Sequence, residues 1–317
     1  MRCLALAQAW LDAGNDTVWL AAHALPETML RRYEREGVRV REVGQGREAV
    51  AEAVRATNAD WTVLDGYEFG VEEQLAVKEQ GRRLIVVDDD GAAGQYIADI
   101  VVDPNVFADK DRYRTLANET RLLLGPSYAL LRREILRVGV TVAPNERRRS
   151  VLVSFGGADP AGLSLVALEA LGSTDLDVTL VVGPANASRG RVESAAASFN
   201  NVRVVWDAPD MRTLMDTADL ALVAAGGTSL ELAHLGVPQL VVVTAENQRR
   251  VAQALAERGV ARSLGGAGGL GVADIYEAVV ALAADPGARR AMRERGMALV
   301  DGLGAARVIA CTREQVA

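Results

Sequence analysis

Two glycine pairs in the second half of the chain each follow an apolar run and precede a helical pattern. The pairs are Gly156-Gly157 and Gly226-Gly227. Glycine lets the backbone approach a ligand closely, and amides at a helix start carry partial positive charge, so both turns suit an anion. No lysine follows either pair, so neither is a Walker P-loop. The alternative interpretation is a tight strand-to-helix turn without a ligand.

Thr228 and Ser229 add two hydroxyl groups directly after the second glycine pair. With the neighbouring amides, they could donate hydrogen bonds to a diphosphate. Glu231 has two interpretations. The spacing Thr228-x-x-Glu231 matches a capping box, in which the carboxylate accepts from a backbone amide. Alternatively, the carboxylate accepts hydrogen bonds from both hydroxyls of a ribose beside the phosphates.

Asn247 and Gln248 follow a third apolar run. Amide side chains both donate and accept hydrogen bonds, which suits a sugar that carries hydroxyl and amide groups. Asn247 is also a common helix N-cap residue, and this is the structural alternative. Similarly, Asp159-Pro160 predicts the N-cap and first position of the helix after the first glycine turn.

These segments lie in a chain of alternating apolar runs and helical patterns. The runs are 17–22, 37–43, 60–65, 83–90, 98–105, 150–157, 177–184, 201–208, 218–227 and 238–247. Many are apolar throughout, which is typical of parallel strands covered by helices on both faces. We therefore predict a GT-B-like α/β fold: two doubly wound Rossmann-like domains with parallel sheets and an interdomain cleft.

A change of composition at 137–150, with one proline and three consecutive arginines, predicts the domain boundary. We predict an N-terminal domain at 1–142 and a C-terminal domain at 149–317 that includes the terminal helices. The last helical segment, from 304 onward, could instead return to the first domain. At the other end, one apolar face formed by Leu4, Leu6, Trp10 and Leu11 predicts a short helix that Gly14-Asn15 ends.

The 317 residues are 50% hydrophobic and 24% charged, as in globular proteins, and the net charge of −7 argues against a nucleic-acid partner. No run approaches the ~20 apolar residues of a membrane span, so we expect a cytoplasmic protein. Cys3 and Cys311 are too few for a disulfide framework or a zinc site. We predict no cofactor and no metal, and interpret the acidic run 88–90 as a polar loop.

Several segments together resemble a known family. SFGGADP, AAGGTSLELAHLGVP and AENQ resemble the C-terminal domain of GT-B nucleotide-sugar enzymes related to MurG. MRCLALAQAW, VLDGYEF, VVDDDG, ADIVVDPN and LLLGPSYALLRREI are similar to UDP-sugar hydrolases of the PseG family, which includes spore-coat polysaccharide proteins. The resemblance extends across nearly the whole chain.

The resemblance implies hydrolysis of a UDP-linked 2,4-diacetamido-trideoxy sugar, in which water displaces UDP at the anomeric carbon with inversion and without a metal. It implies that the diphosphate is held by Gly226, Gly227, Thr228 and Ser229, and the ribose by Glu231. It also implies that the phosphates are approached by Gly156 and Gly157, and that the sugar or its phosphate is contacted by Asn247 and Gln248. From the first domain, the sugar would be faced by Asp65 and Tyr67.

The family has a strand and Gly-x-Gly-His, with the histidine as expected base, before the segment that matches residues 2–7. The sequence given begins after that motif, and neither His23 nor His234 matches it. Asp65 is then a candidate base on the condition that desolvation raises its pKa, with Tyr67 beside it. The alternatives are a GT-B glycosyltransferase that uses a UDP-sugar and an inactive nucleotide-sugar-binding protein. A sheet edge without this strand could be covered by a second copy, which would make a homo-oligomer.

Overall fold

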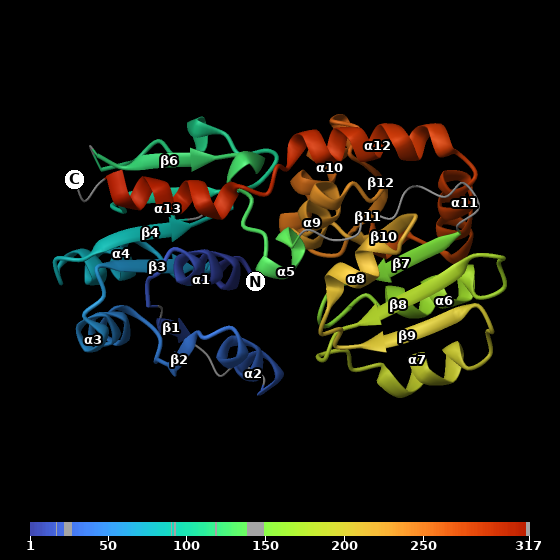
Figure 1. Cartoon of the computed structure of the whole chain (residues 1–317), viewed down its shortest axis with the longest axis horizontal. Helices are drawn as coiled ribbons and strands as arrows, with labels where there is room; N and C mark the ends of the chain where they lie inside the picture. Colours follow the sequence, from blue (N-terminus) through green and yellow to red (C-terminus); the bar gives the residue numbers. More distant parts are fainter. Residues whose placement is uncertain are drawn as a thin grey trace. The chain divides into compact units, whose positions relative to one another are not determined.

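The computed structural model of the chain describes residues 1–16, 18–21, 27–89, 91, 93–117, 119–137 and 149–314. Its contacts divide the chain into two units, Met1–Arg133 with Gly302–Ala317 (unit 1) and Glu134–Asp301 (unit 2). All strand pairs among the described residues are parallel. The predicted α/β class, with two Rossmann-like units, is confirmed (Figure 1).

Unit 1 holds two sheets, a small one of β1 and β2 and a larger one in the order β3-β4-β5-β6. Its elements are α1 (Arg2–Asp12), β1 (Val18–Ala21), α2 (Glu27–Arg35), β2 (Arg39–Glu42), α3 (Arg47–Thr57), β3 (Trp61–Asp65), α4 (Val71–Lys78), β4 (Arg83–Val87), β5 (Ile100–Asp103), η1 (Lys110–Arg112), β6 (Arg121–Leu124), η2 (Pro126–Tyr128) and α13 (Gly304–Glu314). The predicted short helix before Gly14 is confirmed as α1.

The larger sheet of unit 1 is covered on both faces because its strands are apolar at successive positions. Ile85 and Val87 belong to a core with α1 and α13, whereas Leu84 and Val86 belong to a core with α3 and α4. Side chains alternate between the faces of a strand, so a continuously apolar strand requires helices on both sides.

The last helix belongs to unit 1. Ala305, Val308 and Ile309 of α13 are buried against β4, β5 and α1, and α13 lies beside these elements in Figure 1. This division differs from the predicted boundaries of 1–142 and 149–317, which placed all terminal helices in the second domain. The predicted linker falls largely on residues 138–148, outside the described residues.

Unit 2 has one six-stranded sheet in the order β12-β11-β10-β7-β8-β9. Its elements are β7 (Ser150–Ser154), α6 (Leu163–Leu171), β8 (Asp177–Val182), α7 (Arg189–Ala196), β9 (Val202–Trp206), α8 (Met211–Asp216), β10 (Leu220–Ala224), α9 (Gly227–Leu235), β11 (Gln239–Val243), η3 (Glu246–Gln248), α10 (Arg249–Glu257), β12 (Ala261–Gly266), η4 (Ala267–Gly269), α11 (Val272–Ala283) and α12 (Pro286–Leu299); α5 (Arg133–Leu136) lies at the boundary between the units.

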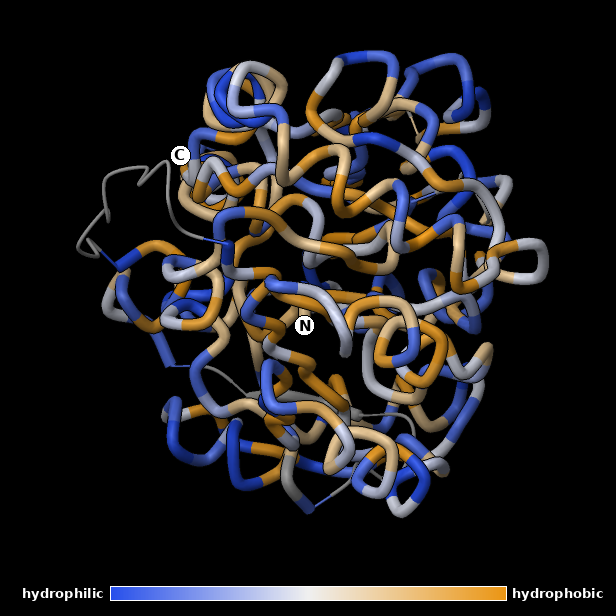
Figure 2. The backbone as a smooth tube through the Cα atoms, turned by 90° about the vertical axis from the view of Figure 1, so that its right-hand side faces the viewer, coloured by the Kyte–Doolittle hydropathy of each residue, from blue (hydrophilic) through white to orange (hydrophobic). Residues whose placement is uncertain are grey.

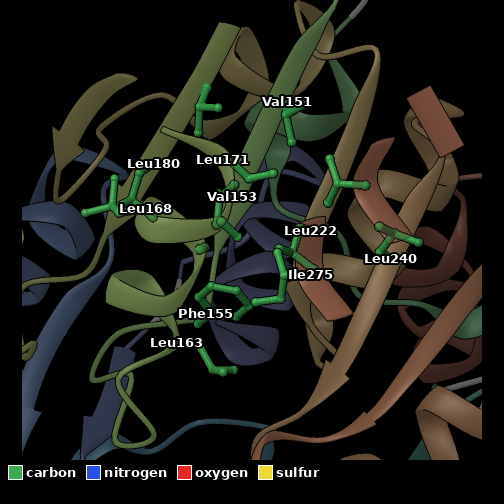
Figure 3. Packing of buried hydrophobic residues seen from close by; sticks show 14 of the residues in the cluster. Val151, Val153, Phe155, Leu163, Leu168, Leu171, Leu180, Leu222, Leu240 and Ile275 are labelled. Carbon is green, nitrogen blue, oxygen red and sulfur yellow. The ribbon is translucent and has the colours of Figure 1, made fainter. Parts of the chain in front are cut away.

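One face of this sheet packs on α6, α7 and α11. Figure 3 shows Val151, Val153 and Leu222 of neighbouring strands in this layer, with Leu168 of α6 and Ile275 of α11. The hydropathy colours in Figure 2 change between orange and blue along single helices, as expected for helices with one buried face. Helices α9 and α10 contact β10, β11 and β12.

Candidate functional site

The strand order of unit 2 creates a switch point between β7 and β10. Strands β8 and β9 extend from one side of β7, and β10, β11 and β12 extend from the other. In such sheets the loops after the two central strands diverge, which leaves a crevice at their carboxyl ends where ligands bind. The two predicted glycine turns are the segments that follow β7 and β10. The fold therefore brings them to the same edge of the sheet.

The turn from β10 to α9 exposes the start of a helix to a ligand. Gly226 is the N-cap of α9 in an extended conformation and, as a glycine, supplies no side-chain cap. The amides of Gly226 and Ser229 donate to backbone carbonyls of the turn. Gly227 and Thr228 supply the first-turn amides that have no acceptor within a helix, beside the half-buried Thr228 hydroxyl. Helix-start amides of this kind can bind an anion.

Ser229 differs from the prediction because its donors are used within the fold. Its side chain is fully buried, its hydroxyl donates to the Ala224 carbonyl at 3.4 Å, and its amide donates to the Gly226 carbonyl at 2.9 Å. The buried Gln239 donates to the carbonyl of Ser229 at 2.9 Å. Ser229 therefore shapes the turn rather than presenting a hydroxyl at its surface.

The capping-box interpretation of Glu231 does not match the helix. Because α9 begins at Gly227, Thr228 lies inside the first turn and not at the N-cap. Glu231 is buried, with 7% of its surface exposed. Glu231 is the fifth residue of α9, about one turn after Gly227.

The start of α6, after the first glycine turn, is occupied by a side chain of the protein. Asp159 is buried, and its carboxylate accepts hydrogen bonds from the amides of Leu163 at 3.0 Å and Ser164 at 2.8 Å. The helix begins at Leu163, so the predicted N-cap at Asp159 with Pro160 in the first turn is wrong.

The first glycine turn contributes backbone that a ligand can approach. Gly156 has a φ of +83°, which favours glycine, and added Cβ atoms at Gly156 and Gly157 would meet nothing within 4 Å. Gly183, after β8, supports this turn from the other side: a Cβ there would lie 2.4 Å from the Cα of Gly157. The amide of Ala185 also donates to the Gly157 carbonyl at 3.1 Å.

Gln248 lies next to the start of α9. A Cβ added at Gly226 would lie 4.0 Å from Nε2 of Gln248. The side-chain carbonyl oxygen Oε1 of Gln248 accepts hydrogen bonds from the backbone amide of Thr244 at 2.9 Å and from the Thr244 hydroxyl at 3.0 Å. Asn247 is exposed within η3 and is not the N-cap of α10, because Gln248 occupies that position.

In unit 1, Asp65 and Tyr67 join a polar cluster at the carboxyl end of β3. Arg2 forms ion pairs with Asp65 at 2.6 Å and with Asp89 at 3.1 Å. Cys3 donates to Asp65 at 3.0 Å, and the exposed Tyr67 donates to Asp89 at 3.0 Å. Burial lowers the pKa of Arg2, but Asp65 and Asp89 more than offset this and raise it. Burial and the Asp65 charge raise the pKa of Cys3.

Two buried tyrosine–carboxylate pairs hold the neighbouring loops of unit 1. Tyr96 donates to Asp88 at 2.7 Å, and Tyr113 donates to Asp103 at 2.9 Å. Burial raises the pKa of Asp103 above its ordinary value of 3.8, whereas hydrogen bonds from Asn105 and Tyr113 oppose that rise. Burial and the nearby carboxylates also raise the pKa of Tyr113. These groups are internal supports of the strand ends.

The remaining chemical candidates lie apart from these groups. Nδ1 of His234, at the end of α9, lies 3.1 Å from the Val300 carbonyl, and His23 and Asp90 lie outside the described residues. Within the described ranges, no group of three or more histidine, cysteine or acidic side chains is arranged to hold a metal. Arg189 covers the ring of Trp206 at 4.4 Å, on edge strand β9, away from the switch point.

Sequence reasoning missed three supporting residues: Gly183, Thr244 and Arg2. Gly183 follows a predicted strand, and Gly183-Pro184 is a turn signal, but its contact with Gly157 depends on how two loops approach. Thr244 is four residues before Gln248, and this spacing was the available signal for their contact. The ion pairs of Arg2 with carboxylates more than 60 residues away had no local signal.

No protein-family model matches the chain. The chain is 27% identical over 235 residues to the uncharacterized protein MJ1062 of Methanocaldococcus jannaschii, a match that covers 70% of this chain and 48% of that protein. It therefore spans about half the length of this relative. It is 26% identical over 281 residues to the spore coat polysaccharide biosynthesis protein SpsG of Bacillus subtilis, covering 85% of this chain and 81% of SpsG.

Solved structures share the fold at low sequence identity. MurG of Acinetobacter baumannii matches with a TM-score of 0.68 at 16% identity, covering 99% of this chain and 95% of MurG. The calicheamicin glycosyltransferase CalG4 matches with a TM-score of 0.67 at 16% identity, covering 99% and 94%. MnaA of S. aureus, solved with UDP, matches with a TM-score of 0.65 at 13% identity, covering 97% and 91%. The chain therefore has the GT-B fold.

No helix within the described part of the chain is both long and apolar enough to cross a membrane.

Proposed function

We propose that the chain is a nucleotide-sugar enzyme that binds a UDP-sugar on unit 2 and releases UDP by cleaving the bond at the anomeric carbon. One observation carries this proposal: the start of α9, with Gly226 as its N-cap, lies at the switch point of the sheet, with Gln248 against it. A helix start of this kind stabilises an anion through amides and dipole alone. A diphosphate is such an anion.

The proposed residue roles follow the geometry of the turn. The backbone at Gly226, with the amides of Gly227 and Thr228, binds the diphosphate, and Glu231 accepts hydrogen bonds from the ribose. The remaining proposed contacts are backbone approach at Gly156 and Gly157, and the sugar or its phosphate at Asn247 and Gln248. Ser229 supports the turn through its buried bonds.

The proposed reaction is hydrolysis. Water attacks the anomeric carbon, the bond from that carbon to the phosphate oxygen breaks, and UDP leaves with the electron pair. Preorganised amides at α9 stabilise the negative charge that develops on the leaving group. The attacking water loses a proton to a general base. The proposed substrate is a UDP-linked diacetamido-trideoxy sugar, and the name of SpsG, a spore coat polysaccharide biosynthesis protein, supports a role in polysaccharide biosynthesis.

Asp65 is the proposed base, with Tyr67 beside it. The carboxylate of Asp65 accepts hydrogen bonds from Arg2 at Oδ1 and from Cys3 at Oδ2, and each oxygen keeps a further lone pair that can accept a hydrogen bond from water.

A second candidate is glycosyl transfer, in which a sugar hydroxyl replaces water. It is supported by the glycosyltransferase CalG4 among the proteins that share the fold. A third is binding without turnover. All three predict the same UDP site on unit 2 and differ in the fate of the bond at the anomeric carbon.

Calorimetric titration with UDP tests the shared part of the proposal, and a UDP-release assay with UDP-amino sugars tests the reaction. Release in water alone indicates hydrolysis, and release only with an added sugar acceptor indicates transfer. Binding without release in either assay supports the third candidate. Absence of UDP binding contradicts all three.

A further inference from the structure

The side-chain amide of Gln248 is fixed in one orientation by Thr244. The backbone amide of Thr244 lies 2.9 Å from Oε1 of Gln248, and its hydroxyl lies 3.0 Å from the same atom. A backbone N–H can only donate, so the atom it meets must be the carbonyl oxygen of Gln248 and not the NH₂ group. The two ends of the amide are therefore not interchangeable.

This orientation turns the donor end of Gln248 toward the start of α9. Nε2 lies 4.0 Å from the position that a Cβ on Gly226 would occupy, and Gly226 has no side chain between them. An anion bound at the amides of Gly227 and Thr228 would therefore have a further N–H donor nearby, from Gln248 at the N-cap of α10. A donor that is oriented before binding loses less entropy when the ligand arrives.

We infer that Thr244 is a positioning residue that holds Gln248 as a hydrogen-bond donor to the anion at the start of α9. The inference rests on the proposed function, because it assigns the ligand atom beside Gln248 as an acceptor, which a phosphate oxygen is. Thr244 itself does not touch the ligand. Its hydroxyl acts through the carbonyl oxygen of Gln248.

The test compares UDP affinities by calorimetry. Thr244→Val removes the hydroxyl at nearly constant volume and leaves the backbone donor, so UDP affinity should fall by about three- to tenfold. Thr244→Ser keeps the hydroxyl and should restore most of the affinity. Thr217→Val is the matched control, because the Thr217 hydroxyl in the same unit donates only to carbonyls of α8 and should leave UDP affinity unchanged.

A double-mutant cycle separates positioning from a general structural effect. Gln248→Ala should weaken UDP by about tenfold. If Thr244 acts only through Gln248, Thr244→Val should cause no further loss in the Gln248→Ala background. Thermal unfolding of each variant checks that unit 2 remains folded, and Gln248→Glu, which keeps both Thr244 bonds but presents no donor, should lose UDP as Gln248→Ala does.

The failures are distinguishable. A wild-type chain that does not bind UDP contradicts the proposed function, and the inference falls with it. Wild-type binding with an unchanged Thr244→Val variant overturns the inference alone. Equal losses from Thr244→Val with and without Gln248 overturn it as well, because they show that Thr244 acts by another route.

Discussion

Gly183 and Gly157 meet through their backbones, where the ends of β8 and β7 lie side by side. A Cβ on Gly183 would lie 2.4 Å from the Cα of Gly157 and 2.5 Å from its carbonyl oxygen. Because Gly157 belongs to the turn proposed to approach the phosphates, this contact limits where that turn can lie relative to the end of β8. We therefore expect the packing of these two strand ends to affect UDP affinity.

Gly183→Ala should displace the turn at Gly157. We expect the unfolding free energy to fall by about 1–3 kcal/mol, the scale of an overpacked site, and UDP affinity to fall with it. Gly157→Ala is the matched control, since its Cβ meets no atom within 4 Å. It should leave stability nearly unchanged and weaken UDP by obstructing the ligand. Urea unfolding and calorimetry measure both; a Gly183→Ala chain of wild-type stability would contradict the contact.

Glu231→Ala should weaken UDP by roughly tenfold or more, the scale of losing a charge-assisted hydrogen bond to the ribose. Asp159→Ala, at another buried carboxylate of unit 2, should cost about 0.5–2 kcal/mol of stability through the start of α6 without changing UDP affinity. Calorimetry and urea unfolding of the two variants distinguish these effects. Unchanged UDP affinity in Glu231→Ala would leave this carboxylate with a structural role.

Asp65→Asn should lower the rate of UDP release by about a hundredfold or more if Asp65 is the base, while UDP affinity on unit 2 stays the same. Asp89→Asn is the comparison, since Asp89 also pairs with Arg2 but is not proposed to take a proton. It should reduce release much less. Tyr67→Phe removes the donor to Asp89 and should have a similarly small effect. Equal rates for Asp65→Asn and wild type would exclude Asp65 as the base.

Asp103 should give unit 1 a measurable pH dependence. Burial raises its pKa in the folded state above the ordinary value of 3.8, so the folded state binds this proton more tightly than the unfolded state. The stability that protonated Asp103 contributes is therefore fully present below pH 3.8 and is lost as the pH rises through the raised pKa of Asp103. Asp103→Asn removes this change.

Urea unfolding of wild type and Asp103→Asn between about pH 4 and 7 tests the direction of this change in stability. The stability of wild type relative to the variant should decrease as pH rises. Tyr113→Phe removes a hydrogen bond that opposes the raised pKa, so it should move this decrease to higher pH. A relative stability that increases with pH would contradict the direction.

The sequence predicted the fold class because continuously apolar runs indicate strands buried on both faces. It missed β12, since Ala261–Gly266 contains three glycine or serine residues and no apolar run, and pairs with β11 through its backbone. It also missed the short β6. Strand β12 has no hydrophobic pattern that distinguishes it from a loop, whereas β6 has an apolar run of only three leucines after Arg121.

The candidate site was predictable where local chemistry determines it. Glycine pairs after apolar strands indicated the two turns, and both follow the central strands of unit 2. Helix starts were less predictable. Asp159 has a φ of +43° and reaches the amides of α6 from outside the helix, and α9 begins before Thr228 because Gly226 serves as N-cap without a side chain. The spacing of residues in the sequence does not predict these backbone conformations.

Because α13 completes the core of unit 1, that unit is built from both ends of the chain. During synthesis from the N-terminus, all of Glu134–Asp301 emerges before α13 exists. Unit 2 can therefore assemble its core first, while one apolar face of β3–β6 remains partly uncovered until α13 has been synthesised. Unit 1 therefore finishes folding after unit 2, and removal of α13 would expose part of the core of unit 1.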